Sequence, residues 1–148
     1  MTLKEIKRAV NDALKKEYPG ARIYGNDTIE GYEKPAFFVY VMQTFAESTK
    51  NARHKNVEVE IDYIQKRPDE VEGMNFLEKA EEIFGQKLTV GYRSLSTANI
   101  DCQFQGENQN IPVVTFDIEF WDNIEKRETT ETMKTLIISQ EVTQGDYR

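Results

Sequence analysis

The feature that most constrains the fold is a strict alternation of apolar and acidic residues in the middle of the chain. The apolar positions are Val57, Val59, Ile61 and Tyr63, and the acidic positions between them are Glu58, Glu60 and Asp62. Successive side chains of a β-strand point to opposite faces, so this pattern predicts a strand with one buried and one polar face. A second alternating segment, ending at Trp121, has Asp117 and Glu119 on its polar side. Two such strands favour an antiparallel sheet with one solvated face.

The segment from Ala36 to Thr44 predicts a strand that is apolar on both faces. One face carries Phe37, Val39 and Val41, and the other carries Phe38, Tyr40 and Met42. Such a strand needs cover on both sides. Helices would cover one side, and a neighbouring subunit could cover the other, which makes Phe38 and Tyr40 candidate interaction residues.

Two amphipathic helices are predicted. Residues 2–18 form the first, because Thr2 and Glu5 make a capping box and apolar residues recur at helical spacing. The second begins at Pro68-Asp69-Glu70, and Gly85 is its C-terminal cap. Its predicted apolar stripe is Val71, Met74, Leu77, Ala80 and Phe84, with Ile83 beside it.

The remaining segments complete a single α+β domain with a mostly antiparallel sheet and two helices on one face. Short strands are expected near residues 22–25 and 88–92, a polar loop over 45–53, and a hairpin whose first strand contains Cys102. The composition becomes polar after Trp121. We therefore divide the chain into a domain over residues 1–122 and a C-terminal extension over 123–148.

Composition excludes several classes of protein. The chain has 148 residues, a net charge of −7 and a sequence pI of about 4.9, which disfavours tight binding of nucleic acid. Its longest apolar run has seven residues, far below the roughly 20 that a membrane helix needs, so no membrane association is expected. The charged N-terminus does not look like a signal peptide, and a single cysteine fits a reducing cytoplasm.

No motif for catalysis or for a cofactor emerges. Phosphate-binding glycine loops are absent from the sequence, and the only histidine, His54, has cationic neighbours. We expect no metal and no cofactor. Cys102 could act as a nucleophile with His54, but a cysteine between Ile100 and Phe104 on an apolar face more often behaves as a small hydrophobe.

The acidic rows admit three interpretations. Glu58, Glu60, Asp62, Asp117 and Glu119 could supply a carboxylate pair for acid–base chemistry or a divalent-metal site. They could equally be a solvated sheet face, which is the commoner case. In a ring, they could face a lumen and repel passing DNA. The sequence does not choose between the last two.

Two further segments are candidate interaction surfaces. Lys50, Arg53 and Lys55 form a basic cluster that could dock onto an acidic partner. An apolar patch in the extension could form a last strand of the sheet or add a strand to the edge of a neighbour's sheet. This patch is Leu136, Ile137 and Ile138.

Together, several of these segments resemble the tail-terminator (tail-completion) proteins of tailed phages, particularly the small ones of Firmicutes prophage-like and tail-like particle (bacteriocin) gene clusters. The segments are the opening helix over residues 3–10, Tyr18-Pro19, residues 35–39, residues 57–63 and residues 114–121. The resemblance covers about residues 1–122.

The resemblance implies a curved sheet packed by two helices and a non-enzymatic, hexameric ring. Such a ring caps the tail tube, ends its polymerisation and meets the head connector or, in contractile tails, the last sheath ring. The implied partners are further copies of the chain, the tube protein, the sheath protein and the connector, with DNA only as passing cargo. The protein would assemble in the bacterial host cytoplasm and then become part of the particle. Alternatives are another connector or baseplate subunit, a small-molecule-binding regulatory domain and an enzyme.

Overall fold

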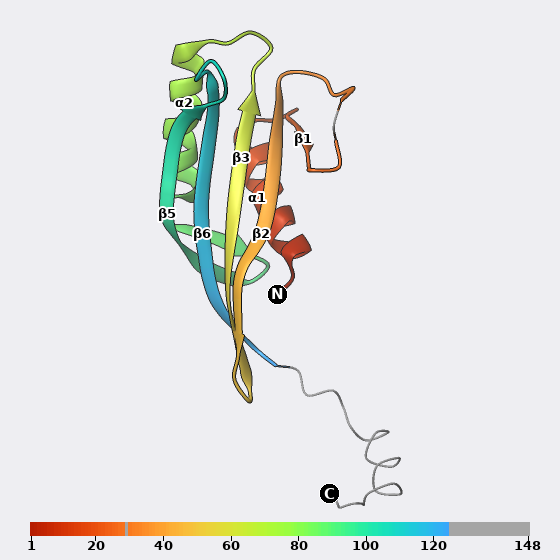
Figure 1. Ribbon diagram of the computed structural model, residues 1–148, viewed down its shortest axis with the longest axis vertical. Helices are drawn as coiled ribbons and strands as arrows, with labels where there is room; N and C mark the ends of the chain where they lie inside the picture. Colours follow the sequence, from red (N-terminus) through yellow and green to blue (C-terminus); the bar gives the residue numbers. More distant parts are fainter. Residues whose placement is uncertain (29, 125–148) are drawn as a thin grey trace, which may run out of the picture.

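The computed structural model describes residues 1–28 and 30–124 as a six-stranded sheet with two helices (Figure 1). The elements are α1 (Leu3–Glu17), β1 (Arg22–Tyr24), β2 (Ala36–Ser48), β3 (Ala52–Ile64), α2 (Glu70–Phe84), β4 (Lys87–Val90), β5 (Arg93–Gln105) and β6 (Ile111–Asn123). The strand order is β1-β2-β3-β6-β5-β4, in which only β1 and β2 are parallel. Both helices lie on the same face of the sheet (Figure 1). The predicted α+β class is therefore confirmed.

Helix α1 begins as its sequence predicts. The Thr2 hydroxyl accepts a hydrogen bond from the Glu5 N–H (3.1 Å), and the Glu5 carboxylate accepts one from the Thr2 N–H (2.7 Å). These two bonds satisfy N–H groups that have no partner within the helix. One turn apart, Ile6, Val10 and Leu14 are fully buried against the sheet.

The apolar stripe predicted for α2 is partly wrong. Val71 and Met74 are 64% and 45% exposed, whereas Gly73 and Phe76 belong to the buried face. The reason is the close approach of the helix to the sheet at Gly73. A Cβ atom at that position would lie 2.7 Å from the ring of Phe104, so the absence of a side chain turns this face of α2 inward.

The polar loop predicted over residues 45–53 is also wrong. Strand β2 continues to Ser48 and β3 begins at Ala52, which leaves a turn of three residues. Cross-strand contacts satisfy the polar side chains of this extension: Arg53 Nε donates to Ser48 Oγ (3.0 Å), and Asn56 Nδ2 donates to Thr44 Oγ1 (2.7 Å). Polarity alone suggested a loop, but paired strands can carry polar side chains on an exposed ribbon.

The core lies between the helices and the sheet. Phe84 of α2 stacks on Phe116 of β6 with ring centroids 5.2 Å apart, and Phe37 stacks on Tyr63 at 4.9 Å. The largest side chains that are almost completely buried include Phe76, Phe84 and Phe116. None of the helices in the described parts of the chain is long and apolar enough to cross a membrane.

Candidate interaction surfaces

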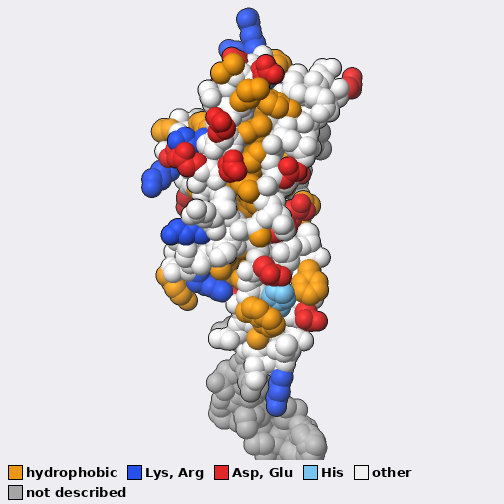
Figure 2. Space-filling view, turned by 90° about the vertical axis from the view of Figure 1, so that its left-hand side faces the viewer, with side chains coloured by type: hydrophobic (Ala, Val, Ile, Leu, Met, Phe, Trp, Pro, Cys, Tyr) orange, Lys and Arg blue, Asp and Glu red, His pale blue; other side chains and the backbone are white. Residues whose placement is uncertain are grey.

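We call the side of the sheet that faces away from the helices the open face. All five predicted acidic residues lie there, on the neighbouring strands β3 and β6. Glu58 is directly opposite Asp117, Glu60 is opposite Thr115, Asp62 is opposite Val113, and Glu119 is opposite Asn56. Open-face positions of β2, β3 and β6 contain no lysine or arginine along their described lengths. Figure 2 shows acidic side chains beside a band of hydrophobic ones on the surface that carries His54.

The upper part of β2 is covered on its second side by the chain itself. Phe38 is buried beneath Tyr24 and Tyr32, whose ring centroids lie 5.6 and 4.9 Å from its own. Tyr40 stacks on Phe38 at 6.4 Å and is half-buried. The two-faced strand therefore needs no neighbouring subunit at Phe38, whereas Met42, farther along, is 44% exposed.

Asp62 is the most unusual acid of the open face. Its Oδ1 atom is buried and has no hydrogen-bond partner among the described residues. The pKa of its carboxyl is raised to about 8, mainly by burial and further by the hydrogen bond and the charge of the nearby Glu60. Asp62 is therefore mostly protonated at neutral pH, unlike an ordinary surface aspartate.

An aromatic cluster lies at the hairpin end of the open face. The imidazole of His54 stacks on the Trp121 ring at 4.6 Å and meets the edge of Phe45 at 5.5 Å. Its Nε2 atom lies 3.1 Å from a carboxylate oxygen of Glu119. Trp121 and Phe45 remain 53% and 45% exposed, so this cluster leaves apolar surface accessible at the hairpin end.

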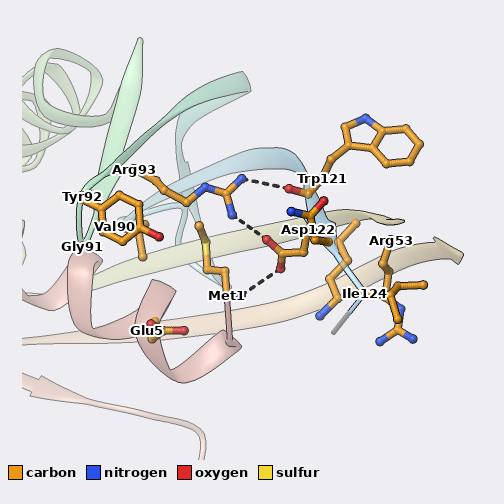
Figure 3. A pocket seen from close by; sticks show the side chains of 12 residues that line it. Met1, Glu5, Arg53, Val90, Gly91, Tyr92, Arg93, Trp121, Asp122 and Ile124 are labelled. Atoms are coloured by element: carbon orange, nitrogen blue, oxygen red, sulfur yellow. Dashed lines mark hydrogen bonds and ion pairs between the residues drawn. The ribbon is translucent and has the colours of Figure 1, made fainter. Parts of the chain in front are cut away.

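Two members of the predicted basic cluster line a hollow of about 810 Å³ near the N-terminus (Figure 3). Arg53 and Lys55 belong to β3, and Lys50 lies in the adjoining turn. Within the hollow, Asp122 accepts hydrogen bonds from the N-terminal ammonium (2.9 Å) and from Arg93. Burial would raise the pKa of Asp122, but these two hydrogen bonds and the two positive charges outweigh it and hold that pKa below its usual value.

Replacing Arg93 with alanine should lower the free energy of unfolding by about 1–2 kcal/mol at pH 7, because half-buried Asp122 loses a charged donor. The lowered pKa of Asp122 means that this contribution is present above the usual aspartate pKa and is lost as pH falls below it. Urea unfolding at pH 7 and at pH 3 measures the change. Lys55→Ala, at the rim of the same hollow, is the matched control, and an equal loss in both variants would contradict the pairing.

The candidate nucleophile Cys102 and its proposed partner His54 are not brought together. Cys102 packs beside the core on the helix side of β5, whereas His54 lies on the open face. Burial raises the pKa of the Cys102 thiol, which disfavours the reactive thiolate. No group of three or more metal-ligating side chains is found within residues 1–28 and 30–124. Leu136, Ile137 and Ile138 lie outside the described residues.

Sequence patterns missed Arg93 and Asp122, because these partners lie 29 residues apart and neither belongs to a motif. Trp121 could have been identified from the sequence as a candidate surface residue, because it is a large apolar residue on the polar side of an alternating strand.

The sequence as a whole settles the family. A family model described as phage tail terminator protein matches residues 5–131. The chain belongs to the phage tail terminator family. Tail terminators are structural components of the phage tail, so this terminator is part of the virion and associates with other tail components.

Other comparisons add little to this assignment. No curated protein matches the terminator chain. One solved structure shares 14% sequence identity with it, and the match covers 86% of this chain and 99% of that one with a TM-score of 0.46. Similarity at that level carries no argument about function.

Proposed function

We propose that this terminator forms a hexameric ring that caps the finished tail tube and ends its polymerisation. The ring also joins the tube to the head connector or, in contractile tails, to the terminal sheath ring. It makes and breaks no covalent bond. The family match over residues 5–131 carries the proposal, and the six-fold symmetry rests on the resemblance of the sequence. Assembly takes place in the host cytoplasm, before the ring becomes part of the particle.

The open face lines the lumen of this ring, and the helices lie outside. The distribution of charge supports this orientation. An ordinary solvated surface mixes both signs, but the open-face positions of β2, β3 and β6 have acids and no lysine or arginine along their described lengths. Negative charge around a lumen keeps passing DNA from binding to the wall.

The basic cluster of Lys50, Arg53 and Lys55 faces an acidic partner at the hairpin end, and the tube protein is the partner we assign to it. The chain beyond Ile124 acts as an arm outside the domain, since Asn123 still pairs with Ala52 and the N–H of Ile124 still donates to Asn51.

Size-exclusion chromatography with light scattering tests the function. The terminator is measured alone and then mixed with the tube protein of the same particle. A closed ring, or a monomer that joins tube ends and limits tube length, is the expected result. A monomer that ignores tubes at high concentration would contradict the proposal and favour a regulatory domain, for which a metabolite thermal-shift screen is the next step.

Reversing two charges tests the orientation. Glu58→Lys combined with Asp117→Lys places positive charge at directly opposed positions of β3 and β6. The assembled ring should then retain duplex DNA in a salt-sensitive manner, which the wild-type ring should not do. Filter binding at 50 and 200 mM salt measures the retention. The matched control reverses Glu78 and Glu81, exposed on α2. Equal DNA retention by the control ring would refute a lumen-facing sheet.

A further inference from the structure

Within residues 1–28 and 30–124, both long borders of the sheet contain backbone that has no strand partner. β1 pairs with β2 only from Ala36 to Phe38, so residues 39–48 are unpaired on their outer side within the described chain. β4 pairs with β5 only from Arg93 to Ser96, and the N–H of Thr97 still donates to the carbonyl of Gln86. Residues 98–105 are therefore unpaired on their outer side within the described chain. Figure 1 shows these two strands at opposite borders of the four long strands. We call these stretches the β2 edge and the β5 edge.

Hydrogen bonds at the hairpin show which groups of the β2 edge point outward. The N–H of Thr49 donates to the carbonyl of Ala52, and the N–H of Ile124 donates to the carbonyl of Asn51. In antiparallel strands these directions alternate along the chain, so Lys55, four residues after Asn51, also points toward β6. Ala46 is opposite Lys55. The N–H and carbonyl of Ala46 therefore point away from β3, toward the side on which no described strand lies.

Neither edge carries lysine or proline, which blunt many natural edges against pairing with another chain. Residues 39–48 and 98–105 contain no lysine, arginine or proline, and a single bulge in each stretch is the one such protection present. Met42 and Phe45, on the edge strand β2, are 44% and 45% exposed. Strands of this kind are templates for β-strand addition.

We propose that the β2 edge of one copy of this chain pairs with the β5 edge of the next copy, which makes the subunit interface of the ring. The inference rests on the ring function proposed above. Along the sheet β2, β3, β6 and β5 are each antiparallel to the next, so β2 and β5 run in opposite directions. Copies related by rotation about the ring axis would therefore meet in an antiparallel pair. Two different edges make the heterologous contact that a ring requires, whereas a pair of β2 edges would close as a dimer.

The joined edges are consistent with the orientation of the sheet in the ring. Continuing the pleat across the interface keeps every open face on one side and every pair of helices on the other. Exposed Met42 and Phe45 would then lie beside the open-face residues of the neighbour's β5, which are Ala98, Asp101, Gln103 and Gln105.

Ala46→Pro tests the β2 edge. Proline removes an N–H that β3 does not use, so the monomer should retain its circular dichroism spectrum and its melting temperature within a few degrees. The same change removes a hydrogen-bond donor from the interface and places the pyrrolidine ring of proline where the neighbour's strand must lie. The affinity between subunits, measured by light scattering with and without tubes, should fall at least about tenfold. Ala46→Thr retains the N–H and should assemble as the wild type does.

Cross-linking tests the β5 edge, where the only cysteine of the chain lies. Val41 and Gln43 are on the helix side of β2, as Cys102 is on β5, and neither is fully buried. With cysteine placed at each in turn, a short bismaleimide should join adjacent subunits for at least one of the two. Adding Cys102→Ser should abolish the product.

The outcomes separate the interface from the function. The edge pairing is supported if Ala46→Pro loses the ring, Ala46→Thr retains it, and cross-links form through Cys102. Rings that form normally from Ala46→Pro, or the absence of every cross-link from assembled rings, would overturn the edge pairing and leave the capping function in place. A wild-type protein that forms no ring and ignores tubes overturns both.

Discussion

Replacing Phe116 with alanine is expected to lower the free energy of unfolding by about 3–5 kcal/mol. Phe116 is 1% exposed in the middle of β6 and stacks on Phe84, the last residue of α2. Truncation removes the ring and leaves a cavity where α2 meets the sheet, so both the burial of apolar surface and the packing of Phe84 are lost. A domain of this size has a total stability of roughly 5–15 kcal/mol, so the variant should lie near the limit of folding.

Urea unfolding followed by circular dichroism measures the loss. Phe116→Leu retains most of the volume and should cost less than about 1.5 kcal/mol. Trp121→Ala is the control on the same strand, because Trp121 is 53% exposed on the open face and should change stability by less than about 1 kcal/mol. Equal losses at the two aromatic positions would show that the helix side of the sheet is not the core.

The second large effect is expected at Asp62. Asp62→Asn should stabilise the protein by about 1–3 kcal/mol at pH 8 and by much less at pH 5. The folded-state pKa is about 8, whereas an unfolded aspartate titrates near 4. Between these values the folded carboxyl retains a proton that the unfolded chain has released. The contribution of Asp62 to the stability of the wild type therefore falls as pH rises from about 4 to about 8, where the buried carboxyl becomes charged.

Thermal unfolding of the wild type and of Asp62→Asn across this pH range isolates the effect, because other titrating groups cancel in the difference. Glu60→Gln removes the neighbouring charge that helps to raise the pKa of Asp62, so it should move the midpoint of the wild-type curve to lower pH. A difference between wild type and Asp62→Asn that does not change with pH would mean that Asp62 titrates as a surface acid.

Asp62 also bears on the proposed lumen. An acid that is partly buried and has no hydrogen-bond partner for one oxygen among the described residues is costly, and such locally unfavourable features are expected at functional sites. At neutral pH the acidic row on β3 is less charged than its sequence suggests, since Asp62 is mostly protonated. Repulsion of DNA would then depend mainly on Glu58, Glu60, Asp117 and Glu119.

The errors made from sequence have one physical origin. Residues 45–53 looked like a loop because they are polar, and α2 looked as though it buried Val71 and Met74 because those residues are apolar. Residues 45–48 instead pair with residues 53–56 at the hairpin ends of β2 and β3, and the close approach permitted by Gly73 turns α2 toward Phe104. Polarity describes the preference of each side chain for water, whereas strand pairing and helix orientation depend on which surface lies opposite.

The sequence by itself determined the helices, the alternating strands, the α+β class and the family. Caps, helical spacing and period-two alternation act within a few residues of each other, so local order in the chain is enough to specify them. Only the tertiary structure decided the burial of Asp62, the ion pair of Arg93 with Asp122, the cover over Phe38 and the two unpaired edges. Each of these features depends on which strands become neighbours and where their pairing stops, and contacts between distant parts of the chain determine that.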